Sequence, residues 1–289
     1  AFGTGNSDSH IKLAKKYNAE FSSDLSIFNN NKLDYDGIII SIPAKEDLTW
    51  LNKLPPTNIL IEKPGQLKSI DLENLNKGIH NIFIAYNRKF YNSYKHLQNF
   101  VKSQSQPSIV NVNIPEPLNP QFEDIDTQRP FNVINNSCHI ISILRGVFGK
   151  LNLEKTLDVE KLFINGSALL NSITSKGHII NLTINLNEFS NTSIEVKGDK
   201  NSLILKPIEE SKEIIGLKSE IDHKNNVRKY FQVIGETSNS YCDFGFKPGF
   251  YKQVEAFTGI CKSRKKSITS LTKLEEGIEI IKEIEYFLI

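Results

Sequence analysis

The chain has 289 residues, 39% of them hydrophobic, which suits one large domain or two ordinary ones and excludes a disordered chain. Its 35 basic and 33 acidic residues give a net charge of +2, so neither nucleic acid nor a membrane surface is an expected partner. No apolar run reaches the ~20 residues of a membrane-spanning helix. The three cysteines and six histidines lack metal-ligand spacing, so no metal site is predicted, and the cysteines fit a reducing, cytoplasmic setting. The chain contains no methionine, and we therefore expect that residues preceding Ala1 are missing from it.

Helix and strand signals alternate over the first third of the chain. Three apolar runs read as strands, at 36–43, 58–64 and 81–87. Residues of helical spacing precede and separate them, at 10–17, 48–54 and 69–78. Runs that are apolar on both faces are typical of central parallel strands. The alternation therefore predicts a doubly wound α/β sheet over residues 1–90.

Strand signals dominate the rest of the chain. After a predicted helix near 94–103 and a strand at 108–114, an irregular loop is expected to about residue 130, followed by a helix at 138–149. Four further β-rich stretches follow, at 168–174, 178–186, 193–198 and 202–207, with hairpin-turn composition at 197–201. We therefore predict a second α/β domain over residues 91–289, with a large and mostly antiparallel sheet. A C-terminal helix over 271–288 carries an apolar stripe that should pack as core.

Polar or turn residues stand at the ends of the three strands of the first domain. They are Ser41-Ile42-Pro43, Glu62-Lys63-Pro64 and Asn87-Arg88. In open α/β sheets, ligands bind beyond the carboxyl ends of the strands, so these residues should line one crevice. One interpretation is that Glu62 and Lys63 are simply solvated where Pro64 ends a strand. The other is that Lys63 acts as a proton donor or acceptor, because the pKa of a lysine shifts readily when the side chain is desolvated.

Six segments stand out, in this order along the chain: "AKKYNAEFSSDLSIF", "YDGIIISIP", "ILIEKP", "IAYNRKFY", "HIISILRGVFG" and "KPGFYKQVEAF". Together they resemble the Gfo/Idh/MocA family of NAD(P)-dependent oxidoreductases over nearly the whole chain. The resemblance implies an N-terminal Rossmann-like domain and a C-terminal α/β domain, together with hydride transfer between a nicotinamide cofactor, NAD or NADP, and a sugar, cyclitol or related alcohol. It also implies a homo-oligomer, a dimer or tetramer, with contacts through the large sheet of the second domain.

The resemblance also assigns roles to individual residues. Lys63 matches the lysine that contacts the reacting hydroxyl and the nicotinamide ribose, and His139 matches a histidine that often acts as acid and base on that hydroxyl. An imidazole with a pKa near ~6.5 suits such proton transfer. Arg88 and Tyr91 would hold substrate hydroxyls or a phosphate. The alternatives are that His139 only packs on an apolar helix and that Arg88 and Tyr91 serve surface or interdomain packing.

The cofactor residues implied by the resemblance lie at the strand ends and near the start of the chain. They are Thr4, Asn6, Ile42, Pro43, Glu62, Lys63 and Pro64. The stretch "FGTGNSDSH" lacks the third glycine of a dinucleotide loop and reads instead as the end of the family's second strand. On this interpretation the first strand, the glycine-rich loop and the first helix are absent from the sequence. Thr4 offers no carboxylate to bind the ribose 2′-hydroxyl of NAD, so the sequence leaves both NAD and NADP as possible cofactors.

Two positions depart from the family pattern. Asn135 and Ser142 stand where the family usually has acidic residues. Asn135 can hydrogen-bond a sugar hydroxyl as a substrate-binding residue, but it cannot accept a proton. We favour an oxidoreductase acting on a sugar or nucleotide sugar, in cell-surface polysaccharide biosynthesis. The alternative is a catalytically silent relative that binds a sugar ligand or a partner protein.

Overall fold

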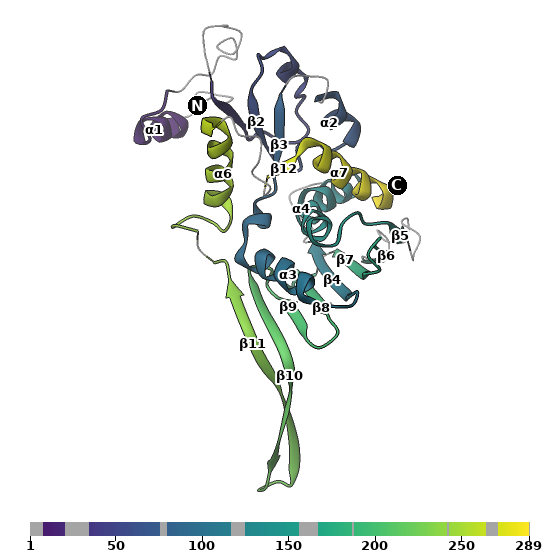
Figure 1. Cartoon of the computed structure of the whole chain (residues 1–289). Helices are drawn as coiled ribbons and strands as arrows, with labels where there is room; N and C mark the ends of the chain where they lie inside the picture. The colour runs from purple at the N-terminus through teal and green to yellow at the C-terminus, as the bar shows by residue number, and fades with distance from the viewer. Residues whose placement is uncertain are drawn as a thin grey trace.

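The frame of the molecule consists of two β-sheets, one in the N-terminal third and one in the remainder (Figure 1). The structure is a computed structural model, and it describes residues 8–20, 35–75, 80–116, 125–155, 167–186, 188–241, 243–263 and 271–288. Over these ranges, none of the helices combines the length and the apolar character that crossing a membrane needs. The two sheets and their helices confirm the predicted fold class, a Rossmann-like sheet followed by a large second sheet.

The first sheet has four strands with helices on both faces. In order across the sheet, the strands are β1 (Gly37–Ile40), β2 (Asn58–Glu62), β3 (Asn81–Ala85) and β12 (Thr272–Lys273). The first three are parallel, and β12 pairs antiparallel with β3. The helices of this part are α1 (Asp8–Lys16), η2 (Thr49–Lys53), α2 (Ser69–Leu75) and α6 (Phe250–Ser263). Ile59, Leu60 and Ile61 of β2 are all buried because α2 packs on one face of the sheet and α6 on the other.

The second sheet has eight strands, and its only parallel pair among the described residues is β4 with β7. In chain order, its strands are β4 (Ile109–Glu116), β5 (Leu153–Lys155), β6 (Ser167–Ile173), β7 (Ile179–Leu186), β8 (Ser193–Lys197), β9 (Ser202–Leu205), β10 (Glu210–Asp222) and β11 (Val227–Asn239). Across the sheet they run β11-β10-β9-β8-β4-β7-β6-β5. The helical segments η3 (Asn87–Phe90), α3 (Asn92–Ser103) and α4 (Ile125–Phe148) lead into it and cover one face (Figure 1).

The C-terminal helix α7 (Leu274–Leu288) returns to the first sheet through β12. Its residues Ile278, Ile281 and Ile284 are buried at helical spacing, as the apolar stripe in the sequence predicts. The helix packs against α2 on one side and α4 on the other, so one core connects the two sheets. The predicted domain boundary near residue 90 stays a prediction. The helix α7 contacts α2, which precedes residue 90 in the chain, and α4, which follows it.

Two features of the second half were not predicted. The segment expected to be an irregular loop to about residue 130 is helical from Ile125 onward, and Pro130 lies inside α4. The strands β10 and β11 form a long antiparallel hairpin. The part of the hairpin near its turn projects away from the rest of the molecule, and the opposite end, its root, lies at the second sheet (Figure 1). By contrast, the turn predicted at 197–201 is present, with the Gly198 amide donating to the Asn201 carbonyl at 2.9 Å.

Candidate functional site

The carboxyl ends of β1, β2 and β3 meet at one edge of the first sheet. The strand register places Glu62 directly beside Ala85, so β2 and β3 end at the same level. Ile42 and Pro43, which follow β1, are exposed at this edge. The residues predicted from the strand ends therefore share one edge, where an open α/β sheet offers its ligand crevice.

A tight turn holds Lys63 at the end of β2. The Gly65 amide donates to the Glu62 carbonyl at 3.0 Å, and the Lys63–Pro64 peptide is cis. Gly65 has φ +90, and a Cβ atom there would collide with side chains of α2 and β3, so the turn requires glycine. Burial raises the pKa of the Glu62 carboxyl, while the charge of Lys63 acts in the opposite direction. Lys63 is therefore fixed on a short, half-buried turn and not on a long solvated loop.

The helix α4 places His139 close to Lys63 and Arg88. The side chain of His139 is 6% exposed, and its ring meets Tyr86 edge to face at 5.9 Å between centroids. Within the described residues, His139 Nδ1 is buried and makes no hydrogen bond. Burial lowers the pKa of His139 well below its usual value, and the nearby charges of Arg88 and Lys63 lower it further. The imidazole is therefore neutral near pH 7 and can accept a proton or a hydrogen bond.

Glu116, at the end of β4, is a further member of the site that the sequence interpretation missed. It is fully buried and accepts hydrogen bonds from Asn136 Nδ2 at 2.8 Å and Ser137 Oγ at 2.7 Å. Burial raises the pKa of this carboxyl to about 7, although both hydrogen bonds and the charge of Arg88 act against the rise. The signal was present in the alternating pattern of β4, because Glu116 occupies the same face as the buried Val112 and Ile114.

Arg88 connects the strand ends to a polar pocket on the flank of the second sheet. Its charge lowers the pKa of both His139 and Glu116, so its guanidinium lies within electrostatic reach of each. The pocket has a volume of about 430 Å³, within the roughly 300–1,000 Å³ of small-molecule sites. Its polar lining consists of Arg88, Asn136, Glu188, Ser190, Asn191, Thr192 and Glu209. Hydroxyl, amide and carboxylate groups of this kind are hydrogen-bonding partners for a polyhydroxylated ligand.

The remaining predicted residues are placed less directly. Tyr91 is buried beside Arg88, and burial raises the pKa of its phenol. Ser142 is also buried, and its Oγ makes no hydrogen bond within the described residues. Thr4 and Asn6 lie outside the described residues, and so does the side chain of Asn135. The structure thus brings together Lys63, Arg88 and His139, and leaves the predicted adenosine end of the cofactor site undescribed.

Comparisons with solved structures find the same architecture in dehydrogenases. A dehydrogenase (MviM) from Clostridium difficile superposes with a TM-score of 0.72 at 14% identity, over 99% of this chain and 88% of that chain. UDP-N-acetylglucosamine 3-dehydrogenase from Acidithiobacillus ferrooxidans gives 0.68 at 10% identity, over 99% and 86%. An oxidoreductase from Agrobacterium radiobacter, in complex with NAD+, L-tartaric acid and magnesium, gives 0.66 at 13% identity, over 99% and 86%. No family model and no curated protein sequence matches the chain. These likenesses show the fold.

Proposed function

We propose that the chain is a Gfo/Idh/MocA-type oxidoreductase that transfers hydride between a nicotinamide cofactor and a hydroxyl or carbonyl of a sugar or nucleotide sugar. The observation that carries the proposal is the meeting of Lys63 and Arg88 with the neutral, buried His139 at the carboxyl edge of a Rossmann-like sheet. The structural neighbours support the same class, since two are dehydrogenases, one of them for a nucleotide sugar, and a third is an oxidoreductase in complex with NAD+.

The described residues fit the reactive end of a nicotinamide cofactor. Ile42, Pro43 and the turn from Glu62 to Pro64 lie at the edge of the sheet where a nicotinamide ribose would bind. His139 Nδ1 is a buried polar atom that makes no hydrogen bond within the described residues, and a bound ligand would supply its partner. When bound, the cofactor would supply the hydride acceptor or donor. Thr4 and Asn6 stay predictions for its adenosine end. Nothing in the described residues favours NAD over NADP.

The chain's own residues would handle the proton that accompanies hydride transfer. In the oxidative direction, Lys63 donates a hydrogen bond to the reacting oxygen and stabilises negative charge that develops on it. The neutral imidazole of His139 accepts the hydroxyl proton as the carbon–hydrogen bond breaks. Arg88 and the polar pocket beside it orient the rest of the substrate, and a phosphate of a nucleotide sugar is a suitable partner for its guanidinium.

The proposal is tested by adding NAD+ or NADP+ to the purified chain with a panel of sugars and nucleotide sugars. We expect absorbance of reduced nicotinamide to appear with at least one substrate, and direct titration to show that the chain binds one of the two cofactors. If a sugar ligand binds and neither cofactor does, the chain is a silent sugar-binding relative instead. Failure to bind either class of molecule would contradict both functions.

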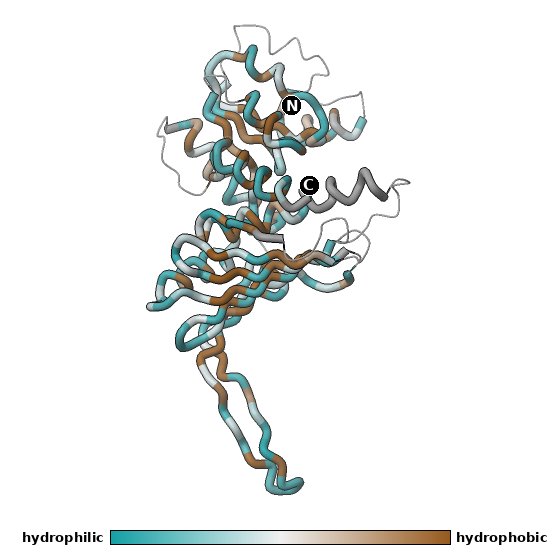
Figure 2. Tube along the Cα trace, turned by 90° about the vertical axis from the view of Figure 1, so that its right-hand side faces the viewer, coloured by the Kyte–Doolittle hydropathy of each residue, from teal (hydrophilic) through white to brown (hydrophobic). Residues whose placement is uncertain are grey.

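We also propose that the chain forms a homo-oligomer and that the β10–β11 hairpin takes part in the contact. Leu217 and Ile221 of β10 share one face with Tyr230 of β11, because the register pairs Ser219 with Tyr230. These three side chains are 73%, 49% and 67% exposed. Figure 2 shows apolar stretches along the hairpin where it projects from the body. A lone two-stranded ribbon is marginally stable in water, so a second copy that covers this face would stabilise it.

The double substitution Leu217→Lys and Tyr230→Lys should therefore convert the oligomer to a monomer. Charged side chains on the buried face of an interface oppose association, whereas the body of the fold, which these residues do not touch, should be unaffected. Light scattering coupled to size-exclusion chromatography measures the mass. Lys218→Gln on the opposite face of the same strand is the matched control, and it should leave the oligomer intact. A wild-type chain that is monomeric at every concentration would contradict this prediction.

A further inference from the structure

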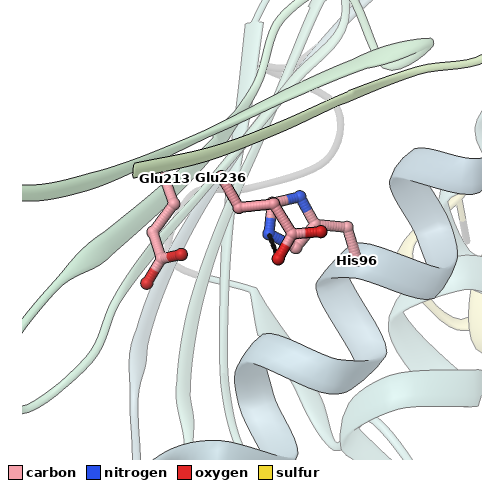
Figure 3. Close-up of side chains that lie close together, drawn as sticks. All are labelled: His96, Glu213 and Glu236. Carbon is pink, nitrogen blue, oxygen red and sulfur yellow. Dashed lines mark ion pairs between the residues drawn. The ribbon is translucent and has the colours of Figure 1, made fainter. Parts of the chain in front are cut away.

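The root of the hairpin carries a cluster of possible metal ligands that lies apart from the candidate active site. His96 comes from α3, Glu213 from β10 and Glu236 from β11. One ring nitrogen of His96 and one oxygen of each carboxylate lie within 4.8 Å of one another. Figure 3 shows the two glutamates extending from the hairpin on the side that faces His96. The spacing rules applied to the sequence predict no metal because these ligands are far apart along the chain.

The orientation of His96 is the observation that points to a ligand. The side chain is only 6% exposed, and its Nδ1 lies 2.8 Å from the hydroxyl of the buried Ser211. With Nδ1–H donating to that hydroxyl, Nε2 carries a lone pair and is aimed at the carboxylates. Nε2 is 3.8 Å from Glu236 Oε2, which is too long for a hydrogen bond, and no other hydrogen bond reaches Nε2 within the described residues.

Two neighbouring residues, Ser211 and Asn201, hydrogen-bond to the side chains of the cluster in the way that the neighbours of metal ligands usually do. A metal-bound histidine usually donates its other ring N–H to a polar partner, and Ser211 supplies that partner. Asn201 Nδ2 donates to Glu213 Oε1 and so fixes one carboxylate. Across the described part of the chain, no lysine or arginine forms an ion pair with Glu213 or Glu236. The carboxylates of Glu213 and Glu236 therefore lie close together beside the imidazole of His96, and a divalent cation would balance their negative charge.

We propose that His96, Glu213 and Glu236 bind a divalent transition-metal ion of the zinc class. A histidine nitrogen with two carboxylates suits Zn²⁺ and its neighbours, whereas Mg²⁺ and Ca²⁺ favour oxygen ligands alone. Metal–ligand bonds of roughly 2.0–2.2 Å require the three ligand atoms to draw together. The side chain of Glu236 is 71% exposed and has the freedom to turn inward. The ion would connect both strands of the hairpin to α3. It would thereby hold in place the base of the β10–β11 hairpin, the segment proposed to contact a second copy.

The test uses the untagged full chain, stripped with a chelator and titrated calorimetrically with Zn²⁺ and, separately, with Mg²⁺. We expect one Zn²⁺ per chain and no comparable binding of Mg²⁺. Glu236→Gln and Glu213→Gln should each weaken Zn²⁺ binding by at least tenfold. Glu220→Gln is the control, because this carboxylate lies on β10 further out and pairs with Lys218 at 2.9 Å. Its Zn²⁺ affinity should equal that of the wild type.

A second readout separates a bound ion from a plain His96–Glu236 contact. Zn²⁺ at a hundred times its Kd should lower the unfolding constant of the wild type about 100-fold, and this protection should be lost in Glu236→Gln. Substitution with Co²⁺ should give a visible absorption band in the wild type and in Glu220→Gln but not in Glu236→Gln. The proposal is overturned if the wild type shows no saturable Zn²⁺ binding, or if Glu236→Gln binds and is protected as well as Glu220→Gln.

Discussion

Replacing Lys63 with methionine is expected to lower kcat/KM for the sugar substrate by about 10²–10³-fold, the usual cost of removing a hydrogen-bond donor that stabilises charge on the reacting oxygen. Methionine keeps most of the aliphatic stem and removes the ammonium group, so the half-buried turn after β2 should keep its shape. The loss should fall mainly on kcat, because the interaction with the reacting oxygen strengthens as charge develops in the transition state. Initial rates of nicotinamide reduction over a range of substrate concentrations give both constants.

The matched control for this experiment is Lys68→Met. Lys68 is an exposed lysine just before α2, and its loss should leave both constants unchanged. Cofactor titration of the Lys63 variant should still saturate, because the other residues at the ends of β1 and β2, from Ile42 to Pro64, are unchanged. If Lys63→Met and Lys68→Met turned over substrate at the wild-type rate, Lys63 would be a solvated turn residue and the assignment of the crevice would fail.

Much of the fold could be predicted from local patterns. The apolar runs that became β1, β2 and β3 have no polar face, and this property alone indicates parallel strands covered by helices on both sides. The carboxyl ends of these strands could then be placed at one edge of the sheet. Lys63 and Arg88 follow two of these strands, and for that reason they were predicted as candidate site residues. The helix carrying His139 was equally visible, although its start at Ile125 was not, because proline is a common sign of a helix end.

The parts that could not be predicted depend on contacts between distant segments. The hairpin of β10 and β11 is exposed on both faces, so its strands lack the alternation that marks a half-buried strand. The alternation of β4 indicates that Glu116 is buried, but it does not indicate that Asn136 and Ser137 of α4 donate hydrogen bonds to this carboxylate. The side chains of His96 and Glu236 meet only because α3 packs against β10 and β11. In these two cases the deciding property is proximity between distant segments, which no short window of sequence contains.

A buried ion pair joins α7 to α4. Arg145 of α4 and Glu283 of α7 are in direct contact, with side chains 13% and 8% exposed. The same Glu283 oxygen accepts a hydrogen bond from the Leu151 amide at 3.0 Å. Burial raises the pKa of Glu283 to about 7, while the charge of Arg145 opposes the rise. Above that pH the Glu283 carboxylate is ionised, and the buried charges of Glu283 and Arg145 stabilise each other.

Glu283→Ala should therefore destabilise the fold by about 3–5 kcal/mol at pH 8, the usual cost of leaving one charge of a buried pair without its partner. The free energy of unfolding, measured by urea denaturation, checks the size of the effect. Glu279→Ala, one turn earlier and exposed beside Lys282, is the control and should cost far less. The double variant Arg145→Met with Glu283→Leu should recover most of the loss, because it removes both charges and keeps apolar volume between α4 and α7. Equal destabilisation of the single and double variants would mean that packing, and not the unpaired Arg145, carries the effect. Since α7 connects β12 of the first sheet to the helix that bears His139, recovery in the double variant would also show that the charges themselves are not required to hold the site together.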